Sequence, residues 1–214
     1  MKIAVIGAGN VGRALGARLV AAGEAVVFGA RDPKATQAVV PAGTTVKTVA
    51  DAVADADIVM LAVPAGSAVA AARAAGLRPG TVLVDGTNPL RFDRGPVWTP
   101  PAEGSVAQAI AAACPAVRVV KAFNHFGAEI HADPQVAGQP ADAMCASDDD
   151  EAKAVVMALA TRLGFRPMDA GGLRNAGVLE NLAVLWIHLA LVSGAGRHVA
   201  FRLVGREGVE GVRS

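Results

Sequence analysis

A glycine-rich turn near the start of the chain constrains its fold more than any other feature. The segment GAGNVG, residues 7–12, follows the apolar run Lys2 to Ile6. It precedes a stretch to about Ala22 in which apolar residues recur at helical spacing. A GxGxxG string between a strand and a helix is the fingerprint of a β-α-β unit that binds a dinucleotide. We therefore predict such a unit at the N-terminus.

The three glycines of this turn have different predicted roles. Gly7 permits the tight turn, Gly9 lets the backbone approach a pyrophosphate, and Gly12 lets the helix pack closely on the strand. The N-terminus of the helix then offers unpaired amides and a partial positive charge to the phosphates. The alternative is a chance string in a chain with 24 glycines. The flanking strand and helix patterns favour the binding site.

The rest of the chain alternates short β-branched runs with alanine-rich helical stretches, which is typical of β-α-β units and a parallel sheet. The runs IAVI, IVMLAV and VLVD are continuously apolar, as expected for strands covered on both faces. We predict an α/β fold with a doubly wound, mostly parallel Rossmann sheet and a C-terminal helical extension. The predicted main strands are Lys2–Ile6, Ala25–Phe28, Thr45–Thr48, Asp57–Val63, Thr81–Asp85 and Val117–Phe123.

Four later elements complete the prediction. Two strands are expected at about Ala143–Ala146 and Phe165–Asp169, with a helix from Asp149 to Leu163 between them. A second long helix is expected from Leu173 to about Leu191. The segment Pro96–Pro101 is the most linker-like part of the chain. No second core follows it in the sequence.

Length and composition suit one globular domain. With 214 residues, 53% of them apolar, burial can offset chain entropy without disulfides or a structural metal. We expect a single NAD(P)-binding domain over residues 1–214, with a core over about 1–170 and a substrate or dimer helix at about 173–192. Further elements are expected to pack on this one core.

Charge and cysteine usage exclude several classes of protein. The net charge of +1 comes from scattered residues, so no field gathers nucleic acid or an anionic membrane. Cys114 and Cys145 have no metal-ligand spacing, and two reduced thiols fit a cytoplasmic protein. The apolar run Leu182–Val192 is shorter than the ~20 residues that span a bilayer. We expect that run to be a buried helix.

The end of the second predicted strand indicates the cofactor. Gly29 and Ala30 stand where an acidic residue would accept hydrogen bonds from the ribose hydroxyls of NAD. Arg31 follows, and a guanidinium can fork onto the 2′-phosphate of NADP, with Lys34 adding a second charge. The alternative makes Arg31 a solvated charge and Asp32 the ribose ligand. The pattern favours NADP(H).

Three later strand ends should converge on the nicotinamide, because ligands lie beyond the carboxyl ends of parallel strands. They are Ala62–Pro64, Asp85–Pro89 with its Asn88, and the segment from Lys121 to His125. His125 is the best candidate for a catalytic proton donor or a hydrogen bond to a ring carbonyl, and the alternative is a structural histidine. The chain has no tyrosine, which excludes the Tyr–Lys pair of many carbonyl reductases.

A few polar residues lie outside these strand ends. His131 and Asp133 are near His125, but the spacing matches no ligand template, so no metal site is expected. On the late helix, Glu180 and Asn181 stand among apolar residues and are expected to face a pocket or a partner helix.

Several segments together resemble the family of deazaflavin (coenzyme F420)-dependent NADP oxidoreductases: GAGNVGRALGARLVAAG, GARDP, LAVP, LVDGTNPL and VKAFNHFGAE. Its members exchange hydride between NADP and a deazaflavin, and the reductase domains of membrane metalloreductases share the motifs. The resemblance implies homodimers whose late helix contributes to the substrate pocket or the interface. It also implies an NADP site lined by Gly9, Asn10, Val11, Arg31, Ala62, Val63, Pro64, Ala122, Phe123 and Asn124.

Three functions remain open from the sequence. The first is an NADPH-dependent reductase of a deazaflavin or flavin-like acceptor, a small-molecule redox substrate. The second is a carbonyl or imine reductase resembling pyrroline-carboxylate reductases, which begin with GAGNxG but continue into an all-helical domain. This chain instead returns to strands at Val117, Ala143 and Phe165. The third is a non-catalytic NADPH-binding or redox-sensing protein.

Overall fold

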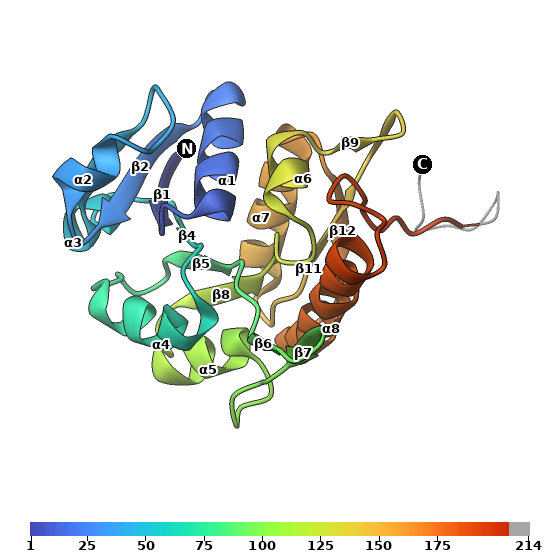
Figure 1. Ribbon diagram of the computed structural model, residues 1–214. Coiled ribbons are helices and arrows are strands. Elements are labelled where there is room, and N and C mark those ends of the chain that lie inside the picture. Colours follow the sequence, from blue (N-terminus) through green and yellow to red (C-terminus); the bar gives the residue numbers. More distant parts are fainter. Residues whose placement is uncertain (206–214) are drawn as a thin grey trace.

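A six-stranded parallel sheet forms the centre of the protein, as the computed structural model of residues 1–205 shows (Figure 1). The strands lie in the order β3-β2-β1-β4-β5-β8. This is the predicted doubly wound Rossmann order, with the switch in strand order between β1 and β4. The strands are β1 (Lys2–Ile6), β2 (Ala25–Ala30), β3 (Thr45–Thr48), β4 (Ile58–Leu61), β5 (Val82–Asp85) and β8 (Arg118–Lys121).

Helices cover both faces of the sheet, which explains the continuously apolar strands. Along β1, Ile3 and Val5 face one core cluster, and Ala4 and Ile6 face the other. Helices α1, α6 and α7 pack in the first cluster, and α3, α4 and α5 pack in the second. The helices are α1 (Asn10–Ala21), α2 (Pro33–Gln37), α3 (Val49–Val53), α4 (Ala65–Ala74), α5 (Val106–Ala113), α6 (Ala128–Ala132) and α7 (Asp150–Arg162).

Local hydrogen bonds fix where several helices begin. Side chains cap four of them by accepting a backbone N–H three residues later: Asp32 for α2, Thr48 for α3, Ser105 for α5 and Asp149 for α7. Such a cap contributes about 1 kcal/mol. Helices α1 and α4 have no side-chain cap. Their first amides are therefore left for another partner.

Two strands are shorter than predicted at their carboxyl ends. β4 ends at Leu61 and β8 at Lys121, whereas the apolar runs continue to Val63 and Phe123. Phe123 has a φ of 59°, a left-handed conformation that cannot continue a strand. The residues beyond both strand ends therefore leave the sheet and can line a ligand site.

The two late strands pair with each other rather than joining the main sheet as full members. β11 (Asp142–Cys145) and β12 (Arg166–Asp169) are parallel neighbours on either side of α7. A single antiparallel bridge between Lys121 and Ala146 connects this pair to β8. A short hairpin of β9 (Gln135–Val136) and β10 (Gln139–Pro140) precedes them.

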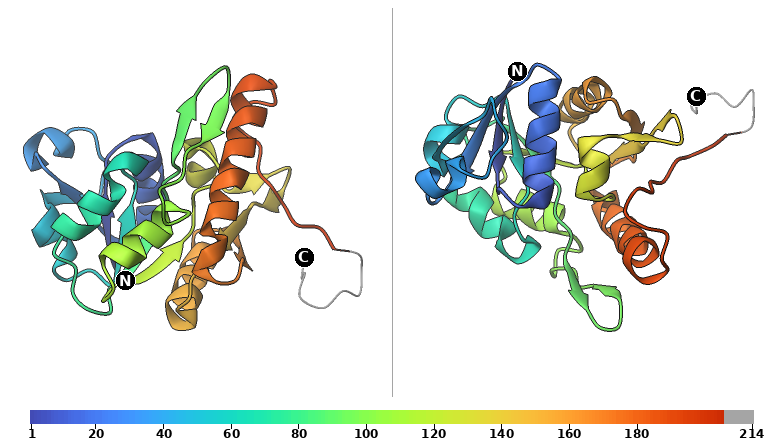
Figure 2. Two further views of the ribbon diagram at one scale, coloured as in Figure 1. Left: turned by 90° about the horizontal axis from the view of Figure 1, so that it is seen from below. Right: turned by 45° about the horizontal axis from the view of Figure 1, so that its top comes forward.

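The segment predicted to be linker-like is instead a packed hairpin. Strands β6 (Leu90–Phe92) and β7 (Pro96–Trp98) pair antiparallel and lie beside the late helix α8 (Ala176–Ile187) (Figure 2). The prediction was wrong because Trp98 binds a distant partner: its Nε1 donates to Glu180 of α8 at 3.0 Å. A proline-rich stretch therefore became part of the folded unit.

The late helical segment covers the predicted range. A 3₁₀ turn (Leu173–Asn175), α8 and a π turn (His188–Val192) follow one another. Within these 20 residues an 18-residue window has a mean hydropathy of 1.5, so the segment is long and apolar enough to cross a membrane by length and composition alone. One face packs on the protein, with Trp186 in the core, but Val178 and Leu185 on the other face are exposed. The expectation of a buried helix was therefore correct for one face only.

Candidate functional site

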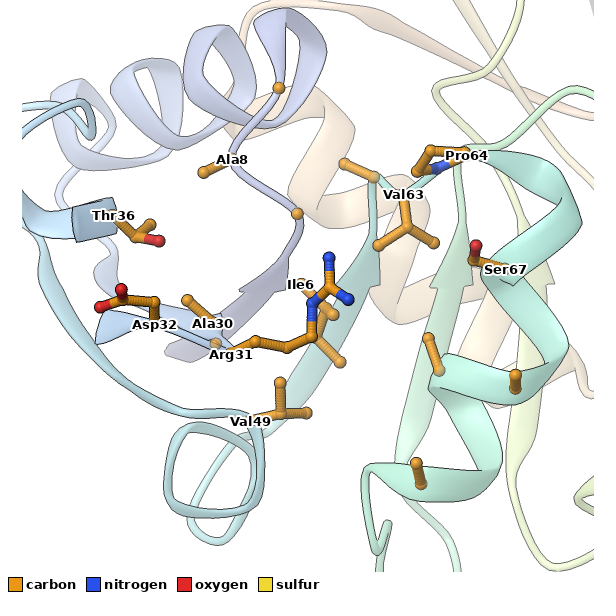
Figure 3. Close-up of a pocket in the computed structure, with 17 residues that line it drawn as sticks. Ile6, Ala8, Ala30, Arg31, Asp32, Thr36, Val49, Val63, Pro64 and Ser67 are labelled. Atoms are coloured by element: carbon orange, nitrogen blue, oxygen red, sulfur yellow. The ribbon is translucent and has the colours of Figure 1, made fainter. Parts of the chain in front are cut away.

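A cavity of about 750 Å³ lies beyond the carboxyl ends of β1, β2 and β4 (Figure 3). Its walls are the glycine-rich turn, the end of β2, the start of α3, the turn after β4 and one side of α4. This is the switch point of the sheet, where open α/β folds bind their ligands. The size is typical of a small-molecule or cofactor site.

Each glycine of the turn is explained by a different structural feature. Gly7 has a φ of +113°, and a Cβ on it would overlap the carbonyl oxygen of Ala62. A Cβ on Gly12 would overlap the carbonyl oxygen of Gly7. On Gly9 a Cβ would meet nothing within 4 Å. Close packing thus requires Gly7 and Gly12. Gly9 has free space around it, so its backbone is accessible from the cavity.

The N-terminus of α1 has the character of an anion site. The helix has no side-chain cap and no acidic residue in its first turn. Asn10 does not serve as a cap, because its Oδ1 accepts from Nη2 of Arg13 at 2.9 Å. The free amides and the helix dipole therefore favour a negative group here. Gly9 lines the cavity directly, and Val11 lines a small neighbouring hollow that shares Ala62 with it.

The residues after β2 supply the charge of the cavity. The guanidinium of Arg31 extends into it, with Asp32 and Thr36 along one side (Figure 3). Asp32 caps α2 through the N–H of Ala35 at 3.0 Å. Lys34 is exposed and does not line the cavity. Sequence reasoning missed Thr36, although its place one helical turn after the cap residue Asp32 was a usable signal.

A second cavity of about 640 Å³ meets the first at Pro64, which lines both. Its walls include the start of α4, the loop after β5 with Asn88, and the segment after β7 with Thr99. Gly66 also lines it, and a Cβ there would meet nothing within 4 Å. Pro64 therefore stands between two neighbouring cavities.

The segment after β8 lines a small hollow that shares Ala62 with the first cavity. Ala122 and Phe123 line the small hollow that also contains Val11 and Ala62. A bulky residue in the left-handed region costs about 1–2 kcal/mol, so the positive φ of Phe123 marks a strained connection at the site. Asn124 is buried and bonded to Asn88.

The structure does not support the predicted acid–base role of His125. Its side chain is fully buried and packs edge-on against Phe126, with ring centroids 4.8 Å apart. Its Nε2 is 2.9 Å from the carbonyl oxygen of Asp142, and burial lowers its pKa to about 4. It lines neither cavity. These contacts favour the structural alternative.

Nearby His131 is a second buried histidine. Neither ring nitrogen has a hydrogen-bond partner among the described residues, and burial lowers its pKa to about 3. Within residues 1–205, no three His, Cys, Asp or Glu side chains gather as metal ligands would. The two histidines belong to an aromatic cluster with Phe123, Phe126 and Phe165.

Sequence reasoning missed a buried charge cluster behind the second cavity. Nζ of Lys121 lies 2.8 Å from Oδ2 of Asp85 and 3.0 Å from Oε1 of Glu180, and all three side chains are fully buried. Asp85 and Lys121 are register partners on β5 and β8. The signal for this pair was one acidic and one basic residue at the ends of neighbouring apolar strands. Asn181 is exposed and lines neither cavity, so of its two expected surroundings the partner helix stays a prediction.

Comparison with known proteins decides the family. Residues 2–89 match the family described as NADP oxidoreductase, coenzyme F420-dependent. The chain is 34% identical over 213 residues to the F420-dependent NADP reductase of Methanothermobacter thermautotrophicus, covering 88% of this chain and 89% of that protein. The chain belongs to the F420-dependent NADP oxidoreductase family. It is therefore an oxidoreductase, which sets aside the non-catalytic alternative.

Solved structures and longer relatives agree with this family. A crystal structure from Arthrobacter sp. FB24, assigned to the F420-dependent NADP reductases, matches with a TM-score of 0.87 and 32% identity over 96% of this chain and 100% of that chain. Metalloreductase STEAP3 of Rattus norvegicus is 32% identical over 84% of this chain, but this chain spans only 36% of its length. A reductive aminase of Aspergillus terreus, at TM-score 0.66 and 17% identity over 90% of this chain and 63% of that one, shares the fold alone.

Proposed function

We propose that this member of the F420-dependent NADP oxidoreductase family transfers hydride between NADP(H) in the first cavity and a deazaflavin or flavin-like acceptor in the second. The observation that carries the proposal is the meeting of the two cavities at Pro64. Hydride transfer between planar rings needs the reacting carbons held within ~3–3.5 Å. Two cavities that share a wall residue offer that proximity.

The residues of the first cavity fit NADP(H). Arg31 and Thr36 would hold the 2′-phosphate, whereas Lys34 lies off the cavity. The amides from Gly9 to Val11 would hold the pyrophosphate, because the open space at Gly9 and the uncapped helix leave room and donors for it. When bound, the cofactor supplies or receives the hydride. The nicotinamide would lie beside Ala62–Pro64, toward Ala122 and Asn124.

The chain itself does little covalent chemistry in this proposal. Its walls hold the two rings and orient them. Reduction of the acceptor takes one hydride from the cofactor and one proton, and water can supply that proton. No buried acid is then required, which agrees with the sealed position of His125. The similarity to an F420-dependent NADP reductase over 88% of this chain disfavours the imine reductase alternative, which the fold alone does not, since a reductive aminase shares it.

Absorbance at the nicotinamide band tests the proposal. Purified protein is mixed with NADPH and, separately, with oxidised coenzyme F420, flavin mononucleotide or a ferric chelate. We expect oxidation of NADPH with coenzyme F420. Turnover with flavin mononucleotide alone would instead identify the acceptor as flavin-like rather than a deazaflavin. An absence of turnover with all three acceptors would contradict the proposed function.

Replacing Arg31 by alanine should weaken NADPH binding by about 2 kcal/mol, roughly thirtyfold, because a charged hydrogen bond to the 2′-phosphate is lost. NADH carries no such phosphate, so its affinity should hardly change. Fluorescence titration of both cofactors measures the two dissociation constants. Lys34→Ala is the matched control, since that exposed side chain lies off the cavity. Equal losses for NADPH and NADH would refute this role of Arg31.

A homodimer through α8 is also part of the proposal. Val178 is 65% and Leu185 48% exposed on the outer face of this helix, and Leu191 and Val192 follow in the π turn. Apolar stripes of this kind are typical of helix interfaces.

Two free cysteines, Cys114 and Cys145, support a cytoplasmic location.

Sedimentation equilibrium checks the dimer. The wild-type protein should have twice the mass of the 21.5 kDa chain, and Leu185→Glu should reduce it to one chain, because a buried unpaired carboxylate opposes association. Val155→Glu places the same charge at an exposed apolar site on α7 and should leave the mass unchanged. A monomeric wild-type protein would refute the dimer.

A further inference from the structure

Asn88 lies on the wall of the second cavity rather than the first. Its Nδ2 donates to the backbone carbonyl of Asn124 at 2.7 Å. Its Oδ1 accepts from Nδ2 of Asn124 at 2.8 Å. The sequence placed Asn88 among the NADP-binding residues, so its position on the second cavity is a change of role that needs explanation.

The orientation of the Asn88 amide is determined by its partners. Nδ2 of Asn124 also donates to the carbonyl of Leu179 at 3.0 Å, and a carbonyl only accepts, so the nitrogen of Asn124 is identified. The oxygen of Asn88 must then face this nitrogen. An amide nitrogen carries two hydrogens. One hydrogen of the Asn88 nitrogen is used, and the other has no partner among residues 1–205.

The backbone next to Asn88 is fixed by the buried charge cluster. Nζ of Lys121 donates to the carbonyl oxygen of Thr87 at 2.5 Å and to Oε1 of Glu180 at 3.0 Å. Glu180 and Leu179 are neighbours on α8. The same helix therefore holds the side chain of Asn88 through Leu179 and Asn124, and its backbone through Glu180 and Lys121.

Glu180 also holds two other walls of this cavity. Its Oε1 accepts from the backbone N–H of Val106 at 2.9 Å, and its Oε2 accepts from Nε1 of Trp98 at 3.0 Å. Val106 lines the cavity, and Trp98 precedes the lining residue Thr99. One carboxylate thus connects three segments that surround the same space.

We propose that Asn88 donates its remaining amide hydrogen to a ring carbonyl of a planar heteroaromatic acceptor, and that Glu180 is the positioning residue for this donor. The inference rests on the proposed function for the class of ligand in the second cavity. Apolar walls such as Pro89, Leu90 and Pro101 suit the faces of such a ring. A donor already held in place loses little entropy when it binds, and an unpaired donor beside apolar walls gains from a carbonyl partner.

Three variants test the two roles by steady-state kinetics with coenzyme F420, or with flavin mononucleotide if that is the acceptor used. Asn88→Ala removes the donor and should raise the KM for the acceptor roughly tenfold, the effect of one lost hydrogen bond. Glu180→Gln keeps the size of the side chain but cannot accept from Lys121, Val106 and Trp98 together, so it should raise this KM severalfold. The dissociation constant of NADPH should stay within about twofold for both.

Asn175→Ala is the matched control. Asn175 is also half-buried and also donates to a carbonyl, that of Ala170 at 2.6 Å, but it lines neither cavity. Its KM for the acceptor should equal that of the wild-type protein. An unchanged acceptor KM in Asn88→Ala overturns the donor role. A loss of NADPH affinity equal to the loss for the acceptor also overturns it.

Side-chain amide signals of ¹⁵N-labelled protein provide a readout that does not need turnover. In the wild-type protein, adding coenzyme F420 or flavin mononucleotide should shift the Asn88 amide signal and slow exchange of its free hydrogen. Glu180→Gln should speed the exchange of both Asn88 hydrogens, whereas Asn175→Ala should not. If the wild-type protein transfers no hydride, the proposed function fails, and this titration still decides the role of Asn88. No shift with either probe overturns the inference.

Discussion

Lys121→Met is expected to lower the free energy of unfolding by about 3–5 kcal/mol, because it leaves buried carboxylates without their cation. Nζ of Lys121 is shared by Asp85, Glu180 and the carbonyl oxygen of Thr87, and none of the three paired side chains reaches solvent. Methionine fills a similar volume, so the loss measures the missing charge rather than a hole. Urea denaturation followed by circular dichroism gives the value.

Lys153→Met is the control for this experiment. Lys153 also binds two carboxylates, Asp150 at 3.2 Å and Asp169 at 3.0 Å, but these partners are 90% and 54% exposed. Lys153 itself is buried, but its carboxylate partners stay in water when the cation is removed, so this variant should lose no more than about 1 kcal/mol. Equal losses for the two variants would contradict the assignment of the Lys121 cluster as a buried, mutually dependent unit.

Stability should fall steeply between pH 6.5 and pH 4 because of the two buried histidines. Burial lowers the pKa of His125 to about 4 and of His131 to about 3, from 6.5 in the unfolded chain. Between these values the unfolded chain binds more protons than the folded protein, so the free energy of unfolding decreases as the pH falls. At pH 5 the two rings together should lower the free energy of unfolding by about 4 kcal/mol relative to its value at pH 8.

Carboxylates account for little of this range of pH, because those with a lowered pKa start from 4.5 or 3.8: Glu24, Glu129, Asp149 and Asp169. The guanidinium of Arg118 lowers the pKa of Asp149 to about 2 from 3.8. The stability that Asp149 contributes is present above 3.8 and is lost only as the pH falls from there toward 2. A loss of stability that begins near pH 6.5 therefore reflects the buried histidines.

Two variants separate the histidine effect from general acid sensitivity. His131→Leu replaces a ring without hydrogen-bond partners among the described residues and should reduce the loss between pH 8 and pH 5 by about 2 kcal/mol. His188→Asn changes an exposed histidine and should leave the loss unchanged. Denaturant unfolding at both pH values checks each variant. A wild-type stability that stays constant from pH 8 to pH 5 would show that the rings are accessible to protons.

Patterns within short stretches were enough to predict the sheet and much of its edge. The alternation of Ile3 and Val5 with Ala4 and Ile6 places apolar side chains on both faces, so a doubly wound sheet follows. The glycine turn and Arg31 could be placed at one end of that sheet because the carboxyl ends of parallel strands share an edge. The structure brings both to one cavity.

Other predictions failed where burial depends on distant segments. His125 follows a strand end, like the residues that line the cavities, but its ring turns into the cluster formed with Phe126 and Asp142. Lys34 was grouped with Arg31, yet the cap at Asp32 begins a helix that carries Lys34 away from the cavity and Thr36 toward it. The position of His125 is not visible in the neighbouring residues, whereas the cap at Asp32 was a local signal for Lys34 and Thr36.

Hydrophobic periodicity, turn glycines and helix caps act over a few residues, so the sequence by itself determined the strand order, the edge of the sheet that binds ligands and the family. Only the tertiary structure decided that Glu180 meets Lys121 across 59 residues of chain, and that Asn88 lines the second cavity. The physical reason is that a buried charge or amide takes its role from whichever partners the packing brings within hydrogen-bond distance.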